Sequence, residues 1–341
     1  MKTDYKIENG VLTFSEGRTE IKNNEFFNKK FTKAIIPEGV TRIGYWSFGS
    51  CSKLEELILP STIVSISHEA FALCEKLKTV VFTNGCPNLT DVSPHSFAIN
   101  SPWMEQVRNT QGFVTFGSLL FAFGKGDSPI IVPDGITIIG RSAFAGCDVE
   151  EVIIPEGVKT IADSAFSQSN IVEVKLPESL ETIGKYAFSN CNGLKEIILP
   201  EKLKTIEKQA FCNCNSLERI HIPEKLKSID EGAFERWMPD KSYQAINVNA
   251  LDGLIPAMLN GCKLDNKTLL WLLEHEWNDE TSLGSVAVVY LTQRGKAVLN
   301  NAELLLWRYK EQAAAAINEL RETYQLKPVV EKKIAEYFEK T

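Results

Sequence analysis

Residues 194–214 read LKEIILPEKLKTIEKQAFCNC, and close copies of this stretch recur along the chain. The most constant feature is an isoleucine five residues before a phenylalanine. This pair occurs at Ile43/Phe48, Ile66/Phe71, Ile139/Phe144, Ile161/Phe166, Ile183/Phe188, Ile206/Phe211 and Ile229/Phe234, with looser copies at Ile21/Phe26 and Val92/Phe97. Most neighbouring phenylalanines are 22 or 23 residues apart. A fixed period of this length predicts a solenoid, in which each repeat packs on its neighbours.

The first part of each repeat alternates between apolar residues and residues that are polar or β-branched, which predicts a short strand. A proline follows this strand in most copies, and it ends the strand because it has no N–H to donate. These prolines are Pro37, Pro60, Pro133, Pro155, Pro177, Pro200 and Pro223. The second half of the repeat is expected to return across the outer side, with its isoleucine and phenylalanine pointing inward.

The L-x-x-I-x-L-P strand and the A-F-x-x-C turn recur together, and this combination resembles the BspA-type leucine-rich repeat of bacterial proteins over about residues 21–234. The resemblance implies a right-handed, curved solenoid with a parallel sheet on its inner side. The predicted fold class is therefore a β-rich α/β solenoid over residues 21–240, followed by a small all-α domain.

The two ends differ from the repeat. Asn9-Gly10 separates two strand-like runs within residues 1–20, which predicts a hairpin that caps the stack. Residues 249–341 lose the strand motif and carry apolar residues at helical spacing, with a cap at Asp265 or Asn266, a cap at Asn300 or Asn301, and Pro328 in the first turn of a last helix. We interpret this segment as a helical domain, whose apolar stripe either forms its own core or receives a partner helix.

The step from Phe97 to Phe144 is 47 residues, close to two periods. We interpret residues 98–130 as one degenerate coil with hairpin character, in which Phe116 and Phe121 keep the five-residue offset. The alternative is a break between two short arrays. Trp103 within this segment is either a packed structural residue or a platform for a ligand.

The net charge of −7 does not suit a nucleic-acid-binding surface, because phosphate contacts need a basic stripe. No apolar run approaches the roughly 18 residues that a membrane-spanning helix needs, so no membrane insertion is expected. The first residues lack the apolar core of a signal peptide. As written, the sequence predicts a cytoplasmic protein; if a leader was removed, the cell surface or secretion is the alternative.

Five of the eight cysteines lie three residues after a repeat phenylalanine, at Cys51, Cys74, Cys147, Cys191 and Cys214. Their place in the repeat predicts reduced, buried side chains that form one column. Ser169 and Asn100 occupy the same position in two copies, which favours a packing slot over disulfide pairing.

The sequence contains no phosphate-binding loop, no Gly-x-Ser-x-Gly and no His-Glu-x-x-His motif. We therefore expect no catalytic residues, no cofactor, no metal site and no enzymatic activity. The four histidines are scattered, at His68, His95, His221 and His275.

The better candidate site is the concave face of the solenoid. In each strand, the residues two and four positions before the proline are expected to point away from the core. They form an aliphatic row beside an acidic row, and an exposed apolar row is typical of an interaction surface. The candidate partner-binding residues are Glu56, Ile58, Glu151, Ile153, Glu173, Lys175, Glu196, Ile198, Arg219 and His221.

Acidic residues in this face favour a protein partner with a basic surface. A purely structural explanation is also open, because β-branched residues suit strands and identical neighbours stack well. Three classes of function compete: an intracellular scaffold or adaptor, a surface or secreted adhesin that binds host or matrix proteins, and an enzyme. The first is favoured, and a monomer is expected because both ends of the stack carry capping segments.

Overall fold

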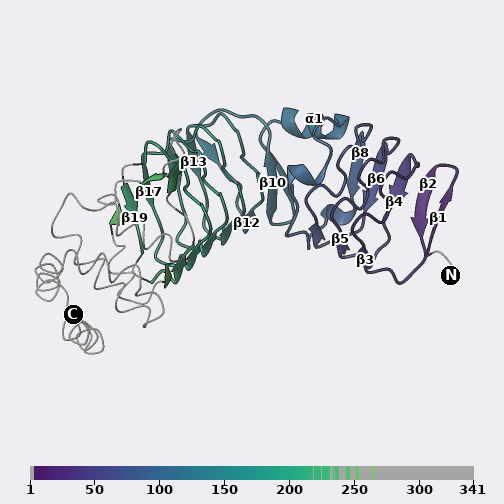
Figure 1. The fold of residues 1–341 in the computed structure, drawn as a ribbon, viewed down its shortest axis with the longest axis horizontal. Helices are drawn as coiled ribbons and strands as arrows, with labels where there is room; N and C mark the ends of the chain where they lie inside the picture. Colours follow the sequence, from purple (N-terminus) through teal and green to yellow (C-terminus); the bar gives the residue numbers. More distant parts are fainter. Residues whose placement is uncertain are drawn as a thin grey trace, which may run out of the picture. The chain divides into compact units, whose positions relative to one another are not determined.

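The computed structural model describes residues 4–217, 219–223, 225–230, 233, 235–237, 243–245, 251–252 and 263–264. The chain divides into two compact units, Met1–Ser169 and Asn170–Thr341. In each unit, the described residues form stacked coils whose short strands run side by side (Figure 1). The expected solenoid with a parallel sheet is confirmed. Among the residues described, no helix is long and apolar enough to cross a membrane.

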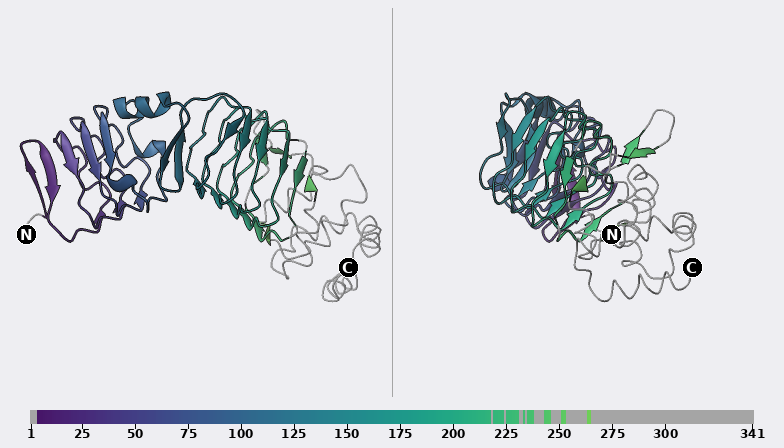
Figure 2. Two further views of the ribbon diagram at one scale, coloured as in Figure 1. Left: turned by 180° about the vertical axis from the view of Figure 1, so that it is seen from behind. Right: turned by 90° about the vertical axis from the view of Figure 1, so that its left-hand side faces the viewer.

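The first unit begins with an antiparallel hairpin (Figure 2). Asn9 and Gly10 connect its strands with positive φ values of 51° and 79°, as a tight hairpin turn requires. The rings of Tyr5 and Phe14 meet the ring of Phe26 edge-on, at 5.0 Å and 5.4 Å between centroids. The hairpin thereby covers the first phenylalanine of the stack.

The strands that precede the prolines form the first sheet. In the first unit, this sheet has the order β1-β2-β4-β6-β8, and it is parallel from β2 onward. Its strands are β1 (Tyr5–Glu8), β2 (Val11–Phe14), β4 (Lys33–Ile35), β6 (Glu56–Leu59) and β8 (Thr79–Phe82). Further along the unit, β11 (Ile130–Ile131) pairs with β13 (Glu151–Ile153) in the same parallel sense.

The repeat isoleucines form a second parallel ladder, which the strand pattern of the sequence did not predict. Each rung is only two residues long, because the turns on both sides leave room for one inward residue and its neighbour. These rungs are β3 (Glu20–Ile21), β5 (Arg42–Ile43), β7 (Ser65–Ile66), β12 (Ile138–Ile139) and β14 (Thr160–Ile161).

The repeat phenylalanines stack in a buried column. The rings of Phe48 and Phe71 lie 4.9 Å apart and 7° from parallel, and those of Phe144 and Phe166 lie 4.8 Å apart. Such stacking holds each coil against the next, because an isolated coil cannot bury its own ring. In the second unit, the rings of Phe188 and Phe211 lie 5.2 Å apart.

In the regular coils, the turn around the phenylalanine places two residues in the left-handed conformation, two positions before and two positions after the ring. The second position includes Asn28, Ser50, Leu73, Gly146, Gln168, Asn190 and Asn213. Asparagine and glycine adopt this conformation most easily, which explains their frequency there.

Two short 3-10 helices, η1 (Thr83–Gly85) and η2 (Pro94–Ser96), precede the irregular coil, which opens with the helix α1 (Pro102–Asn109). The helix begins after Ser101, whose hydroxyl accepts the N–H of Met104. The antiparallel strands β9 (Phe113–Phe116) and β10 (Leu119–Phe123) follow. Trp103 is 8% exposed and packs 4.6 Å from the Phe97 ring, as a structural residue does.

Phe121 keeps the five-residue offset from Phe116, but its ring does not lie in the phenylalanine column. Phe123 occupies the column instead: its ring stacks 5.3 Å from Phe144, and its N–H donates to the Ala143 carbonyl. Phe121 meets Phe97 edge-on at 6.2 Å. The register of β10 shifts between Leu120 and Ala122, and this irregularity moves the inward ring along the chain.

The second unit has strands of the same two kinds. Its first-sheet strands are β15 (Glu173–Lys175), β17 (Glu196–Ile198), β19 (Arg219–His221) and β23 (Leu251–Asp252). Its short rungs are β16 (Thr182–Ile183), β18 (Thr205–Ile206), β20 (Ser228–Ile229) and β24 (Lys263–Leu264). The strands β21 (Glu235–Trp237) and β22 (Tyr243–Ala245), which lie between β20 and β23 in the sequence, pair with each other in antiparallel orientation.

The start of the expected helical domain needs correction. β23 pairs with β19, and β24 pairs with β20, so the described residues at 251–252 and 263–264 are strand. The open edges of β19 and β20 offer unpaired N–H and C=O groups, and pairing satisfies them. The rest of the helical prediction for 249–341 lies outside the described residues, as does Phe234.

Candidate functional site

The aliphatic row of the first unit lies on the outward face of the first sheet. Ile35 pairs with Ile58, and Ile58 pairs with Val81, in successive parallel strands. Ala34 and Leu57, the residues directly before Ile35 and Ile58 in their strands, are fully buried. Val81 is 42% exposed. The alternation predicted from the sequence therefore separates a core face from a solvent face.

The row recurs on the other first-sheet strands. Ile131 pairs with Ile153 in the first unit, and the Ile131 side chain is 63% exposed. In the second unit, Ile198 is 66% exposed and pairs with His221, while Lys175 holds the same position on β15. The structure thus brings the predicted row residues onto one face within each unit.

The acidic row is partly neutralised by neighbouring residues. Glu56 lies 2.8 Å from the ammonium of Lys33 in the adjacent strand, and Glu173 lies 3.5 Å from Lys175. The main chain of Glu196 on β17 is in register with that of Arg219 on β19. The two ion pairs reduce the negative charge that was expected to select a basic partner, so the aliphatic residues are the more distinctive feature of the face.

The cysteine column is held by hydrogen bonds between coils. The thiols of Cys51, Cys74 and Cys214 donate to the carbonyl oxygens of Phe26, Phe48 and Phe188, at 3.2 Å, 3.1 Å and 3.0 Å. Burial raises the pKa of the Cys147 thiol to about 11.

The seven described cysteines form no disulfide with one another, and Cys262 lies outside the described residues. Within those residues, no group of three or more histidine, cysteine or acidic side chains is arranged to hold a metal ion.

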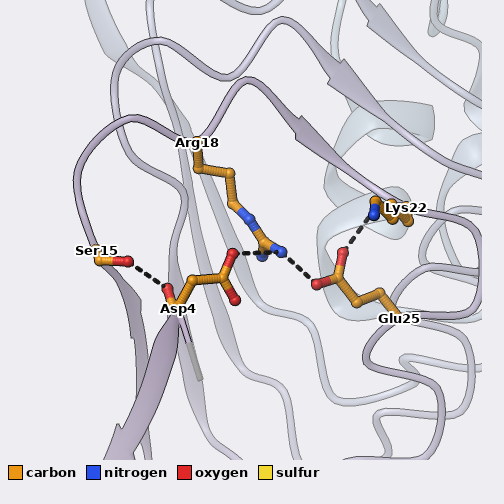
Figure 3. Close-up of polar contacts among 5 residues, drawn as sticks. All are labelled: Asp4, Ser15, Arg18, Lys22 and Glu25. Carbon is orange, nitrogen blue, oxygen red and sulfur yellow. Dashed lines mark hydrogen bonds and ion pairs between the residues drawn. The ribbon is translucent and has the colours of Figure 1, made fainter. Parts of the chain in front are cut away.

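Arg18 forms a polar cluster beneath the N-terminal hairpin (Figure 3). Its side chain is 8% exposed, and its Nη2 atom lies 3.0 Å from Asp4 and also contacts Glu25. The guanidinium lies 5.0 Å from the centre of the Phe14 ring. Glu25 also accepts the N–H of Lys22 at 2.8 Å. No periodic signal in the sequence marks this cluster, which fastens the hairpin to the first coils.

A groove lies on the outer side of the first unit, with a volume of about 640 Å³. The helix α1 and the turns around His95 and Ala143 line it. The rings of His68 and His95 are 5.7 Å apart at one end of the groove. Burial, together with the charge of His68, lowers the pKa of His95. No sequence pattern predicted this groove, because the residues that line it belong to the irregular coil and to turns far apart in the sequence.

This chain is similar to several solved structures of bacterial proteins. A leucine rich cell surface protein from Faecalibacterium prausnitzii has 16% identity and a TM-score of 0.41, over 81% of this chain and 90% of that chain. The pneumococcal vaccine antigen PcpA has 20% identity and a TM-score of 0.38, over 66% and 67%. A leucine-rich repeat protein from Bacteroides ovatus has 25% identity and a TM-score of 0.29, over 62% and 78%.

A search of curated proteins gives no match. The model of the BspA type leucine rich repeat region, in six copies, matches residues 19–126 and 115–238, which is more than half of the chain. The match covers the coils that carry both ladders, the phenylalanine column and the cysteine column. This chain therefore belongs to the BspA-type leucine-rich repeat family.

Proposed function

We propose that this chain is a non-enzymatic protein-binding module, and that it holds a partner against the outward face of its first-sheet strands. The observation that carries the proposal is the exposure of large aliphatic side chains, at 63% for Ile131 and 66% for Ile198. Burying such side chains against a partner removes apolar surface from water, which is the main favourable term in most protein associations.

The fold itself does not require aliphatic residues at these positions. Lys175 and His221 hold the same position in regular strands of the second unit, and the buried residues beside them, Val174 and Ile220, keep their place in the core. Because a polar residue is tolerated at this position, stacking alone does not account for the exposed isoleucines. A binding role does account for them.

The chemistry of the face favours a partner with a complementary apolar strip. The acidic residues Glu56, Glu151, Glu173 and Glu196 flank the strip and favour basic groups at the edge of the partner, weakly where lysine already neutralises them. Such rim charges affect the rate and specificity of association more than its affinity.

A site-specific crosslinker tests this surface. A photoreactive phenylalanine analogue at Ile198 should crosslink a partner in the native host, whereas the same analogue at Tyr186, an exposed residue of the outer turn, should not. The identified partner should then bind Ile198→Asp at least about tenfold more weakly, as expected when an apolar hot-spot contact is lost. Equal crosslinking from both positions, or unchanged affinity of Ile198→Asp, contradicts the proposal.

We favour an intracellular scaffold or adaptor, and a surface or secreted adhesin is the alternative. The buried thiols that donate to carbonyl groups suit a reducing compartment, where cysteines stay unpaired. Protease treatment of intact host cells separates the two locations. Protection of the chain supports the adaptor, and its loss supports the adhesin without affecting the proposed binding face.

A further inference from the structure

The groove on the outer side of the first unit exists because one coil is too short. Between the two ladders, the regular coil runs thirteen residues, from Ile139 to Val152, whereas the preceding coil runs ten, from Leu120 to Ile130. The shorter coil has no room for a complete outer turn. Its chain leaves the stack at Gly124, where the Thr110 carbonyl would lie 2.1 Å from any Cβ atom and only glycine fits.

This departure leaves one rung of the outer ladder open. In regular coils, the residue two positions after the phenylalanine donates its N–H to the next coil, as Asn28 does to Gly49 at 2.8 Å and Gly146 does to Ser167 at 2.9 Å. In the short coil, Lys125 donates to Thr110 instead. The Ala145 carbonyl therefore receives no main-chain N–H from the residues described, and Ala145 is one of the residues that line the groove.

The groove also has an apolar wall and one cation with spare donors. The wall combines the buried Met104 and Val107 of α1 with Ile99, whose side chain is 58% exposed. Arg108 donates one bond of 2.6 Å to the Ile99 carbonyl and has no carboxylate partner among the described residues. A guanidinium has five N–H donors, so Arg108 retains several for an incoming anion.

The other arginine of the groove is already neutralised. Arg141 lies 3.1 Å from Asp91 and 3.7 Å from Asp163. A bound carboxylate is therefore held at the Arg108 end and not at the Arg141 end. The open carbonyl, the apolar wall and the single available cation define three complementary features of a ligand: an N–H donor, an aliphatic group and a carboxylate.

We propose that this groove binds a short peptide segment of a partner protein, with an aliphatic side chain against Ile99 and an acidic side chain on Arg108. A main-chain N–H of the segment completes the hydrogen bond to the Ala145 carbonyl, as an added strand does at a sheet edge. The volume of about 640 Å³ is in the range of ligand sites. This site is separate from the outward face of the first sheet and does not depend on its function.

Fluorescence anisotropy with a labelled octapeptide of alternating leucine and aspartate, (Leu-Asp)4, tests the proposal on the full chain. The alternation allows any register to place a leucine in the groove. We expect saturable binding, weakened roughly tenfold for (Leu-Asn)4, which lacks the charge, and for (Ser-Asp)4, which lacks the aliphatic groups. N-methylation of one alternate set of amides should abolish binding, and methylation of the other set should not.

Two exposed residues supply the variants. Arg108→Gln should weaken (Leu-Asp)4 roughly tenfold and leave (Leu-Asn)4 unchanged, and Ile99→Ser should weaken both peptides. Lys53→Gln, which removes an exposed charge elsewhere, is the matched control and should change neither. Unchanged melting midpoints show that the variants are folded. No saturable binding, equal binding of (Ser-Asp)4, or displacement by decanoate at the peptide's own concentration would overturn the proposal; the last result assigns the groove to small anionic amphiphiles.

Discussion

Replacement of Phe48 by alanine tests whether the phenylalanine column holds neighbouring coils together. The Phe48 ring is fully buried, 4.9 Å from Phe71 and 5.3 Å from Phe26, and both pairs are nearly parallel. Removing a buried phenylalanine ring costs about 3–5 kcal/mol, because burial is lost and a cavity remains. Each ring pair adds about 0.5–1.5 kcal/mol beyond burial, so we expect the upper part of this range, about 4–5 kcal/mol.

Phe48→Leu is the matched control, because leucine keeps most of the apolar volume and loses the stacked pairs with Phe26 and Phe71 and the edge-on pair with Phe31. Its expected cost is about 1–3 kcal/mol. Urea unfolding of the full chain, followed by circular dichroism, measures the stability of each variant. Hydrogen exchange of the β5 and β7 amides locates the change, since each coil rests on its neighbours. An unchanged unfolding midpoint for Phe48→Ala would refute the stacking argument, and equal losses for the two variants would refute the assigned share of the ring pairs.

Three further perturbations probe the cap, the left-handed turn and the cysteine column. Arg18→Ala removes the cation that Asp4 and Glu25 share, so it should lower the free energy of unfolding by about 2–4 kcal/mol and speed hydrogen exchange in β1 and β2. Arg42→Ala breaks the exposed pair with Glu20 and should lower the free energy of unfolding by less than about 1 kcal/mol. Equal losses for the two variants would contradict the role given to burial. Leu73→Asn relieves a left-handed leucine that is 52% exposed and should raise stability by about 0.5–1 kcal/mol in urea unfolding; a loss of stability would show that this side chain packs against a neighbour. The folded-state pKa of Cys147 is raised to about 11 from an ordinary value of 9.0, so the unfolded chain loses this proton at lower pH than the folded chain, and the free energy of unfolding should fall as pH rises from 9 to 11. Cys147→Ser does not titrate in this range and should show a shallower fall. Identical pH profiles for the two proteins would disprove the assignment.

The outward row illustrates how far sequence reasoning reaches into the site. Period-two alternation places Ile58 and Ile198 on the solvent side, and the structure agrees. The ion pair of Lys33 with Glu56 joins residues 23 positions apart, one coil to the next. Its formation depends on the register between strands, which the alternation does not reveal. The groove beside α1 was beyond the sequence for a related reason, since it is made by a departure from the repeat.

The repeat, the strand that each proline ends, and the inward direction of the isoleucine, phenylalanine and cysteine columns can all be predicted from the amino-acid pattern. These features are local and recur in most coils, so a single pattern describes them. The three-dimensional contacts were needed to find the second ladder of two-residue rungs, the place of Phe123 in the column, the partners of Arg18 and the open carbonyl of Ala145. Each of these depends on how one coil meets the next. That contact changes wherever a coil gains or loses residues, even when the pattern on either side is unaltered.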